Sequence, residues 1–334
     1  MTVAVPTLQQ YLRAPLKVGE PNVAGPLAVF PLYGPEPELE YLAFAEGVGR
    51  GVTIHELDGG ASVNDLTVVN PADQAVLLYD GEEVVGAQQN RTFDLSVLIG
   101  AGVKIDVPVS CVEHGRWDGS RHCDALAPAP QTAYPELRRA KNRQVRQAVA
   151  AGMPARAQQG QVWDDVAQKH ERMNTASGTG AMHDIYEQRR DRLVQMLGRI
   201  GRRDEQAGAL VAIGGEFTVL DHVSRPDVYA VLHGPLVQGY ALDALECRAE
   251  TGPPAVDAAQ AFVARVCERR VTEHDGIGLG RDARFQGNGV AGAALVAGDE
   301  LVQLTAFADD VEGGPGSSDA RRARIRRPSS RKTP

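Results

Sequence analysis

Residues 76–92 read VLLYDGEEVVGAQQNRT, and this stretch decides how we interpret the first third of the chain. Val76–Tyr79 is an apolar run of strand length and Asp80–Gly81 is a typical turn pair, so the segment predicts a β-hairpin. Short runs of the same kind, rich in β-branched residues, recur on both sides at intervals of about ten residues. They are Leu27–Leu32, Val52–Glu56, Leu66–Val69, Phe93–Leu98 and Lys104–Val109. This spacing predicts a β-sandwich or a barrel-like core in residues 1–128.

The apolar period lengthens to that of a helix after this β-rich part. Pro135 suits the first turn of a helix and opens an apolar stripe that ends at Gly152. A second helix is expected at Gly160–Met173, and the clearest stripe covers Met182–Ile200. We therefore predict a helical insertion in residues 129–204.

The rest of the chain combines both kinds of element. A helix is expected at Val256–Arg270, and a short one at Glu38–Gly49 within the β-rich part. Residues 205–312 are predicted to form a mixed α/β C-terminal part, and 313–334, which lack periodicity, a disordered basic tail. The strands expected in the mixed part are Ala209–Ile213, Phe217–Leu220, Val228–Leu232, Val237–Tyr240, Ala291–Val296 and Leu301–Phe307. The predicted fold class is α+β.

Charge and composition exclude several classes of protein. The net charge of the chain is −8, and residues 317–334 hold seven Lys or Arg against one Asp, so the remainder is more acidic than the whole. An acidic core disfavours nucleic-acid binding except through the basic tail, and acidic and basic parts together are compatible with a homo-oligomer. No leader or apolar run of membrane-spanning length is visible, and the four cysteines lack CxxC spacing. We expect a cytoplasmic protein with reduced thiols and no membrane contact.

The densest polar cluster follows the predicted hairpin turn. Gln89, Asn90 and Arg91 supply amide donors, amide acceptors and a planar guanidinium, which together suit carboxylate or phosphate oxygens. Strand alternation places Glu83 on one face of the return strand, where it is a candidate acid or base. The alternative is a plain hairpin whose polar end is solvated.

A second polar cluster ends the strand Lys104–Val109. Alternation places Cys111 and Glu113 on the same face as the preceding apolar residues, and a carboxylate there must be paired or protonated. Arg91 or Arg116 is the expected partner, and Trp117 could stack on a ligand. Glu113 is then either half of a structural ion pair or a tuned acid or base, and both interpretations stay open.

Other chemistries find weaker support in the residue pattern. Cys111, His114, His122 and Cys123 are ligand types for zinc, but the adjacent His122–Cys123 pair lacks the usual spacer, so no metal site is predicted. Cys111 as a nucleophile would need His114 as its base. Residues three positions apart on a strand point to opposite faces, which disfavours this pairing. Residues 177–181 (SGTGA) could bind an anion or simply cap the following helix. The cofactor remains unknown.

Both polar clusters resemble a known bacterial family, named for its association with ADP-ribosylglycohydrolases and the rhodanese-phosphatase superfamily. The resemblance rests on Val68–Asn70, on Leu77–Thr92 and on Pro108–Trp117, and it extends over roughly residues 10–310. It implies a part in the metabolism of ADP-ribose or other NAD-derived nucleotides. The family pattern falls on Glu83, Gln89, Asn90, Arg91, Cys111, Glu113, Arg116 and Trp117, and Gln88 stands where a Lys is common.

Two functional hypotheses follow. In the first, the protein is an enzyme or binding protein for an anionic, nucleotide-like small molecule. Arg91 and Arg116 would hold the anion, Gln89 and Asn90 would orient it, and Glu83 or Glu113 would act as the catalytic acid or base. In the second, the same residues form an internal ion-pair network in a non-catalytic interaction module. The sequence does not decide whether the protein is an enzyme.

Overall fold

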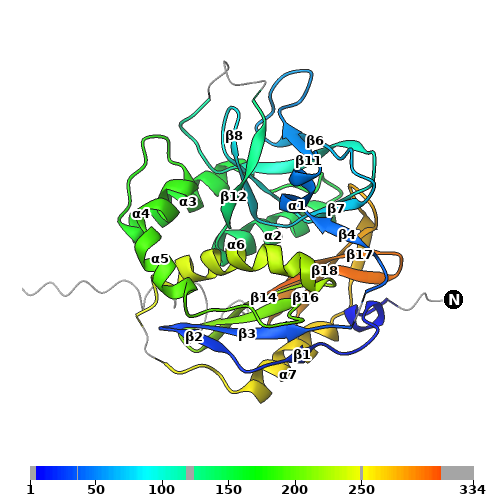
Figure 1. The fold of residues 1–334 in the computed structure, drawn as a ribbon, viewed down its shortest axis with the longest axis vertical. Helices are drawn as coiled ribbons and strands as arrows, with labels where there is room; N and C mark the ends of the chain where they lie inside the picture. Colours follow the sequence, from blue (N-terminus) through cyan, green and yellow to red (C-terminus); the bar gives the residue numbers. More distant parts are fainter. Residues whose placement is uncertain (1–4, 36, 118–123, 249–250, 310–334) are drawn as a thin grey trace, which may run out of the picture.

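A computed structural model of the chain describes residues 5–35, 37–117, 124–248 and 251–309. It confirms the α+β class predicted from the sequence. Two β-rich layers lie one above the other in Figure 1, with helix α6 (Pro226–Ala244) running between them. None of the helices in these residues is both long and apolar enough to cross a bilayer.

The lower layer is a nine-stranded sheet in which every pairing is antiparallel. Its strand order is β1-β3-β13-β14-β18-β17-β16-β15, with β2 pairing on β3. The sheet therefore joins the N-terminal strands to the C-terminal strands. The bounds are β1 Lys17–Val18, β2 Asn22–Ala24, β3 Leu27–Tyr33, β13 Gly208–Ile213, β14 Glu216–Val223, β15 Thr272–Asp275, β16 Arg281–Gly287, β17 Val290–Ala297 and β18 Glu300–Ala308.

The upper layer holds two smaller sheets. A three-stranded sheet has the order β10-β7-β4, with β4 parallel to β7, and a six-stranded sheet has the order β12-β8-β9-β11-β6-β5. The antiparallel sheets of the protein include one that curls into a half-barrel. The bounds are β4 Tyr41–Ala43, β5 Thr53–His55, β6 Asp65–Val69, β7 Ala75–Leu78, β8 Glu82–Gly86, β9 Arg91–Phe93, β10 Val97–Ile99, β11 Lys104–Cys111 and β12 Leu126–Thr132.

Helices cover both faces of the large sheet. The first hydrophobic core packs α6 and α2 against one face, and the second packs α7 and the short helix η1 against the other. A third core fills the small sheets together with α1. The bounds are η1 Leu8–Tyr11, α1 Phe44–Gly49, α2 Pro135–Ala150, α3 Gln159–Met173, α4 Met182–Gln188, α5 Arg190–Leu197 and α7 Val256–Cys267.

The central helix corrects the sequence prediction most clearly. Val228–Leu232 and Val237–Tyr240 were expected to be strands, and that expectation is wrong because both lie in α6. This helix is buried on nearly every side, so its sequence shows no polar face from which a helical period could be recognised. Pro226 at its first turn is the remaining helix signal.

Smaller differences occur at element ends. The helix expected at Glu38–Gly49 begins only at Phe44, because Tyr41–Ala43 pair as a buried strand with β7. The stripe at Met182–Ile200 breaks at Arg189 into α4 and α5. The strand expected at Phe93–Leu98 is interrupted between β9 and β10. The division of the chain into four parts remains a prediction, and the basic tail lies outside the described residues.

Candidate functional site

The two polar clusters lie next to each other because their strands pair. β9 is the common neighbour of β8 and β11, with Arg91 opposite both Val84 and Cys111. Directly opposed residues point to the same face of a sheet, so Arg91 and Cys111 share one face. Glu83 is opposite Thr92 and points to the other face. The structure therefore brings Arg91 together with Cys111 and separates it from Glu83.

Glu113 and Arg116 form a closed ionic cluster beyond the end of β11. Arg116 Nη2 lies 2.7 Å from Glu113 Oε2, and its Nε donates to Oε1 at 2.9 Å. The Asn90 backbone N–H and the Thr179 hydroxyl also donate to this carboxylate, and the Gln89 side chain donates to the Glu113 carbonyl. Burial opposes ionisation of Glu113, but these donors outweigh it and lower its pKa. The expected Glu113–Arg116 pair is present and its carboxylate is internally satisfied.

Arg116 also fixes the turn that follows β8. Its guanidinium donates to the carbonyl oxygens of Gly86 and Ala87 and to Asn90 Oδ1. Ala87 has a φ of 40°, a left-handed conformation that is unfavourable for a residue with a side chain. The Arg116 contacts therefore hold a strained turn in place, which is a structural use of the side chain.

Arg91 is fully buried and only loosely paired. Its Nη2 donates to the Ser62 carbonyl at 3.3 Å and lies 3.8 Å from Glu56 Oε1, and its Nε and Nη1 have no hydrogen-bond partner among the described residues. The guanidinium lies 5.9 Å from the centre of the Trp117 ring, which is half exposed. Trp117 thus contacts the Arg91 guanidinium through a cation–π interaction.

Glu83 forms a separate polar group on the opposite face. Its Oε2 accepts a 2.6 Å hydrogen bond from Gln131, which also contacts His183 Nδ1, and its Oε1 has no partner among the described residues. Burial raises the pKa of Glu83 to about 8, and the nearby negative charges of Glu113 and Asp184 act in the same direction. Glu83 is therefore mostly protonated at neutral pH.

The metal and thiol alternatives gain no support from the geometry. Within the described ranges, no three His, Cys, Asp or Glu side chains are grouped to hold a metal ion, and His122 and Cys123 lie outside them. Cys111 is buried, and desolvation raises the pKa of its thiol despite the nearby Arg91. His114 stacks on Trp163 at 4.3 Å between ring centres. In residues 177–181 the Thr179 hydroxyl donates to Glu113. The N-cap of α4 is Ala181, not Ser177 or Thr179 as one alternative expected, and Ser177 Oγ accepts a hydrogen bond from the Ala181 backbone N–H.

Glu113→Gln tests the structural interpretation of the ionic cluster. The variant keeps the size of the side chain, but its amide has one acceptor oxygen, so one of the two hydrogen bonds from Arg116 is weakened and the other is lost. We expect the free energy of unfolding at pH 7 to fall by about 1–3 kcal/mol. Urea denaturation measures this loss, and a change below about 0.5 kcal/mol would show that the cluster is not structural.

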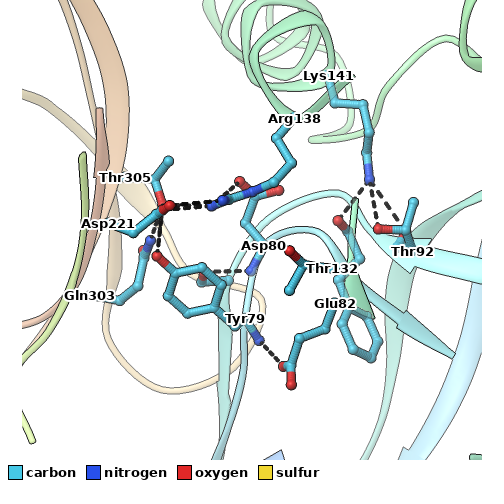
Figure 2. Close-up of polar contacts among 12 residues, drawn as sticks. Tyr79, Asp80, Glu82, Thr92, Thr132, Arg138, Lys141, Asp221, Gln303 and Thr305 are labelled. Atoms are coloured by element: carbon cyan, nitrogen blue, oxygen red, sulfur yellow. Dashed lines mark hydrogen bonds and ion pairs between the residues drawn. The ribbon is translucent and has the colours of Figure 1, made fainter. Parts of the chain in front are cut away.

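A fully buried ionic group around Arg138 was not predicted from sequence. Arg138 of α2 holds the Asp221 carboxylate with two hydrogen bonds of 2.9 and 2.7 Å, and it also reaches Thr305 and Asp80 (Figure 2). The Arg138 side chain is 0% exposed, so its charge depends on these partners. Burial opposes ionisation of Asp221, yet Arg138 outweighs it and lowers the pKa of Asp221. The group connects α2, the large sheet and the turn after β7.

Aromatic residues and a glycine complete this ionic group. The hydroxyls of Tyr79 and Tyr240 each donate to Asp221, at 2.7 and 2.6 Å. Gly81 has a φ of 85°, and a Cβ there would lie 2.6 Å from Arg138 Cδ, so glycine is required for this approach. One turn further along α2, Lys141 ion-pairs with Asp94 at 3.1 Å.

A sequence signal for this group exists, although it is weak. Lys141 falls on the apolar stripe of its helix between Leu137 and Val145, and a charge on a buried face requires a buried partner. The pattern therefore indicates that a carboxylate must lie opposite α2. It cannot indicate which carboxylate, because Asp94, the partner of Lys141, is distant in the sequence.

A large polar groove lies on the outer side of α2. Its volume is about 1090 Å³, and it runs between α2, α3 and the turn that joins β16 to β17. Four arginines line it, with three carboxylates and several amides. None of the predicted site residues lines it. The arginines are Arg139, Arg143, Arg146 and Arg172; the carboxylates are Glu136, Asp165 and Asp309; the amides are Asn142, Gln147, Gln161, Gln168, Gln286 and Asn288.

The fold and the groove describe an α+β protein with a buried ionic core and an arginine-lined cavity at its surface. The chain belongs to the ARG and Rhodanese-Phosphatase-superfamily-associated Protein domain family, ARPP-1, whose profile matches residues 15–307. The match confirms the resemblance that the two polar clusters indicated. No curated protein and no solved structure matches the chain.

Proposed function

We propose that this protein binds an anionic, nucleotide-like small molecule in the groove between α2, α3 and the β16–β17 turn. The observation that carries the proposal is the groove itself, with about 1090 Å³ of space and four arginines on its walls. Small-molecule sites usually measure about 300–1,000 Å³, so a nucleotide-sized ligand would fit.

The charges on α2 support an anion in particular. Arg139, Arg143 and Arg146 recur at helical spacing, so they line one side of the helix. Arg143 and Arg146 form no ion pair with any residue that the structure describes, whereas Arg172 is paired with Glu136 and Glu246. Arginines without a carboxylate partner at the wall of a cavity suit phosphate oxygens.

The remaining lining supports a nucleotide-like ligand over a simple ion. Amide side chains can donate to and accept from the sugar hydroxyls and base edges of a nucleotide. The family resemblance implies ADP-ribose or another NAD-derived nucleotide, and ADP-ribose is therefore the first ligand to test. The proposal is for binding of the ligand, and it assigns no reaction to the groove.

Arg91 is a second candidate place for the anion, as the sequence predicted. Its Nε and Nη1 lack partners among the described residues and could donate to an anion. Arg91 is 0% exposed, so a ligand could reach these atoms only if neighbouring side chains moved, and Glu113 and Arg116 would support the site without contacting the ligand. Glu83 lies on the opposite face of the sheet, with Gln131 and His183. It would therefore not act as an acid on a ligand that is bound at Arg91.

Substitution of groove arginines tests the proposal. Isothermal titration of ADP-ribose should show binding to the unmodified chain, and Arg143→Met/Arg146→Met should weaken it at least about 10-fold, since charged hydrogen bonds contribute roughly 1.5–3 kcal/mol each. Arg192→Met, which removes an exposed arginine on α5, is the matched control and should bind normally. If Arg91→Met weakens the binding of ADP-ribose and Arg143→Met/Arg146→Met does not, the binding site lies at Arg91. No binding of ADP-ribose or NAD would refute the proposed function.

A further inference from the structure

The wall of the groove formed by α3 carries a carboxylate that is only partly used. Gln161, Asp165 and Gln168 are spaced by four and three residues, so they lie on one side of the helix, and all three line the groove. Asp165 Oδ1 accepts a 3.1 Å hydrogen bond from Gln161, whereas Oδ2 is buried and has no hydrogen-bond partner among the described residues. A carboxylate can accept at about four positions, so most of those of Asp165 lack a donor.

The backbone at Asp165 is held in place by contacts on both sides of the groove. The Tyr134 hydroxyl, at the start of α2, donates to the Asp165 carbonyl oxygen at 3.2 Å. One turn further along α3, the buried Lys169 forms ion pairs with Asp243 and Glu246, each at 2.6 Å. Lys169 Nζ also lies 4.4 Å from the centre of the Tyr134 ring. Asp165 therefore lines the groove from a rigid element, which suits a binding residue.

The other two carboxylates of the groove differ from Asp165. Glu136 is paired with Arg172, and Asp309 accepts a 2.9 Å hydrogen bond from Gln286. Neither of them has a buried oxygen without a partner in the part of the chain that the structure describes. A buried acceptor without a donor is costly, and a ligand that donates to it removes that cost. Asp165 is therefore the carboxylate of the groove that gains most from a ligand with hydroxyl groups.

Charges of opposite sign line the groove without meeting. Arg143 of α2 and Asp165 of α3 both line it, yet no ion pair joins them. Burial raises the pKa of Asp165, and the nearby positive charge of Arg143 opposes this only in part. A free phosphate bound by the arginines would be repelled by an ionised Asp165. A phosphorylated sugar can instead place its phosphate on the arginines and its hydroxyls on the carboxylate, so both charges are satisfied.

We propose that Asp165 binds the vicinal hydroxyls of a sugar whose phosphate is held by Arg143 and Arg146. The inference rests on the proposed function of the groove, and it narrows the ligand class to phosphorylated sugars with two free hydroxyls, such as the ribose of a ribonucleotide. The two oxygens of a carboxylate can accept from neighbouring hydroxyls, as an acidic residue does with ribose in dinucleotide-binding folds. Gln161 and Gln168 flank Asp165 and can donate to the same sugar. The groove should therefore discriminate against deoxy analogues.

The test compares two nucleotides that differ only in the sugar hydroxyls. Calorimetric titrations of ADP and of 2′,3′-dideoxy-ADP are performed on the unmodified chain, on Asp165→Ala and on Asp164→Ala. Asp164 is exposed, precedes Asp165 on α3 and does not line the groove, so Asp164→Ala is the matched control. We expect the unmodified chain and the control to bind ADP at least about 10-fold more tightly than its dideoxy analogue. In Asp165→Ala this ratio should fall to about one, and Asp165→Asn, which keeps one acceptor oxygen, should give an intermediate ratio. The melting temperature without ligand shows whether each variant is folded.

The outcomes separate the sugar subsite from the proposed function. If ADP-ribose binds and depends on Arg143 and Arg146, but ADP and dideoxy-ADP bind the unmodified chain equally, the groove function stands and the sugar subsite is refuted. A ratio that is unchanged in folded Asp165→Ala refutes the subsite as well, because the hydroxyls are then bound elsewhere. If ADP-ribose binds and neither ADP nor its analogue does, the affinity for ADP-ribose decides. A loss of at least about 10-fold in Asp165→Ala and none in Asp164→Ala supports the subsite, and equal affinities refute it. Absence of binding by all three nucleotides overturns the proposed function and the subsite together.

Discussion

Arg138→Met is expected to lower the free energy of unfolding at pH 7 by about 3–5 kcal/mol. The substitution removes the two hydrogen bonds to Asp221 and the contact with Asp80, and leaves two carboxylates buried without a cation. Asp80 then becomes protonated readily, because burial already raises its pKa. Asp221 keeps the donors Tyr79 and Tyr240 but loses its charge partner. Urea denaturation followed by circular dichroism measures the loss.

Two further variants define the cause of that loss. Arg143→Met removes an exposed arginine from the same helix and should change the free energy of unfolding by less than about 0.5 kcal/mol. Arg138→Lys keeps the charge but cannot hold both oxygens of Asp221, so it should lie between Arg138→Met and the unmodified chain. If Arg138→Met lowers the free energy of unfolding by less than about 1 kcal/mol, the Asp221 group does not hold the two layers together.

Local patterns predicted most of the fold. β3, β6 and β11 lie where short β-branched runs indicated strands, and α2 and α3 begin and end within a few residues of their apolar stripes. These elements each expose one face or end at a turn residue, which makes their period visible. The exception, α6, is surrounded by protein and carries no such contrast.

The ionic groups divide in the same way. Glu113 and Arg116 are three residues apart, so their pairing follows from local sequence. Arg138 and Asp221 are 83 residues apart, and their contact exists only because α2 packs on the large sheet. The groove is likewise a product of packing, since α2, α3 and the β16–β17 turn are distant in the chain. Sequence reasoning therefore found the polar turns and missed the cavity.

Two buried carboxyl groups should make the stability of the protein depend on pH between about pH 4.5 and about pH 8. Glu82 is 8% exposed and Glu83 is 1% exposed, and burial raises the pKa of each to about 8. An unfolded Glu titrates near 4.5, so between about 4.5 and about 8 the folded state binds more protons than the unfolded state. The free energy of unfolding consequently falls as the pH rises through this window, and the contribution is lost above it. It is complete below about 4.5, where both states are protonated.

We expect the free energy of unfolding to fall by roughly 1 kcal/mol per pH unit for each of Glu82 and Glu83 between about pH 6.5 and pH 8. Glu82→Gln/Glu83→Gln should remove this slope, because each Gln remains neutral and can still accept the hydrogen bonds from Tyr79 and Gln131. Glu113→Gln is the control: the pKa of Glu113 is lowered, so its titration affects stability only at acid pH. Urea denaturation at several pH values measures the three slopes. An unmodified protein whose stability is constant from pH 6.5 to pH 8, or a double variant that keeps the full slope, would show that these carboxyls are ionised in the folded state and must have charge partners.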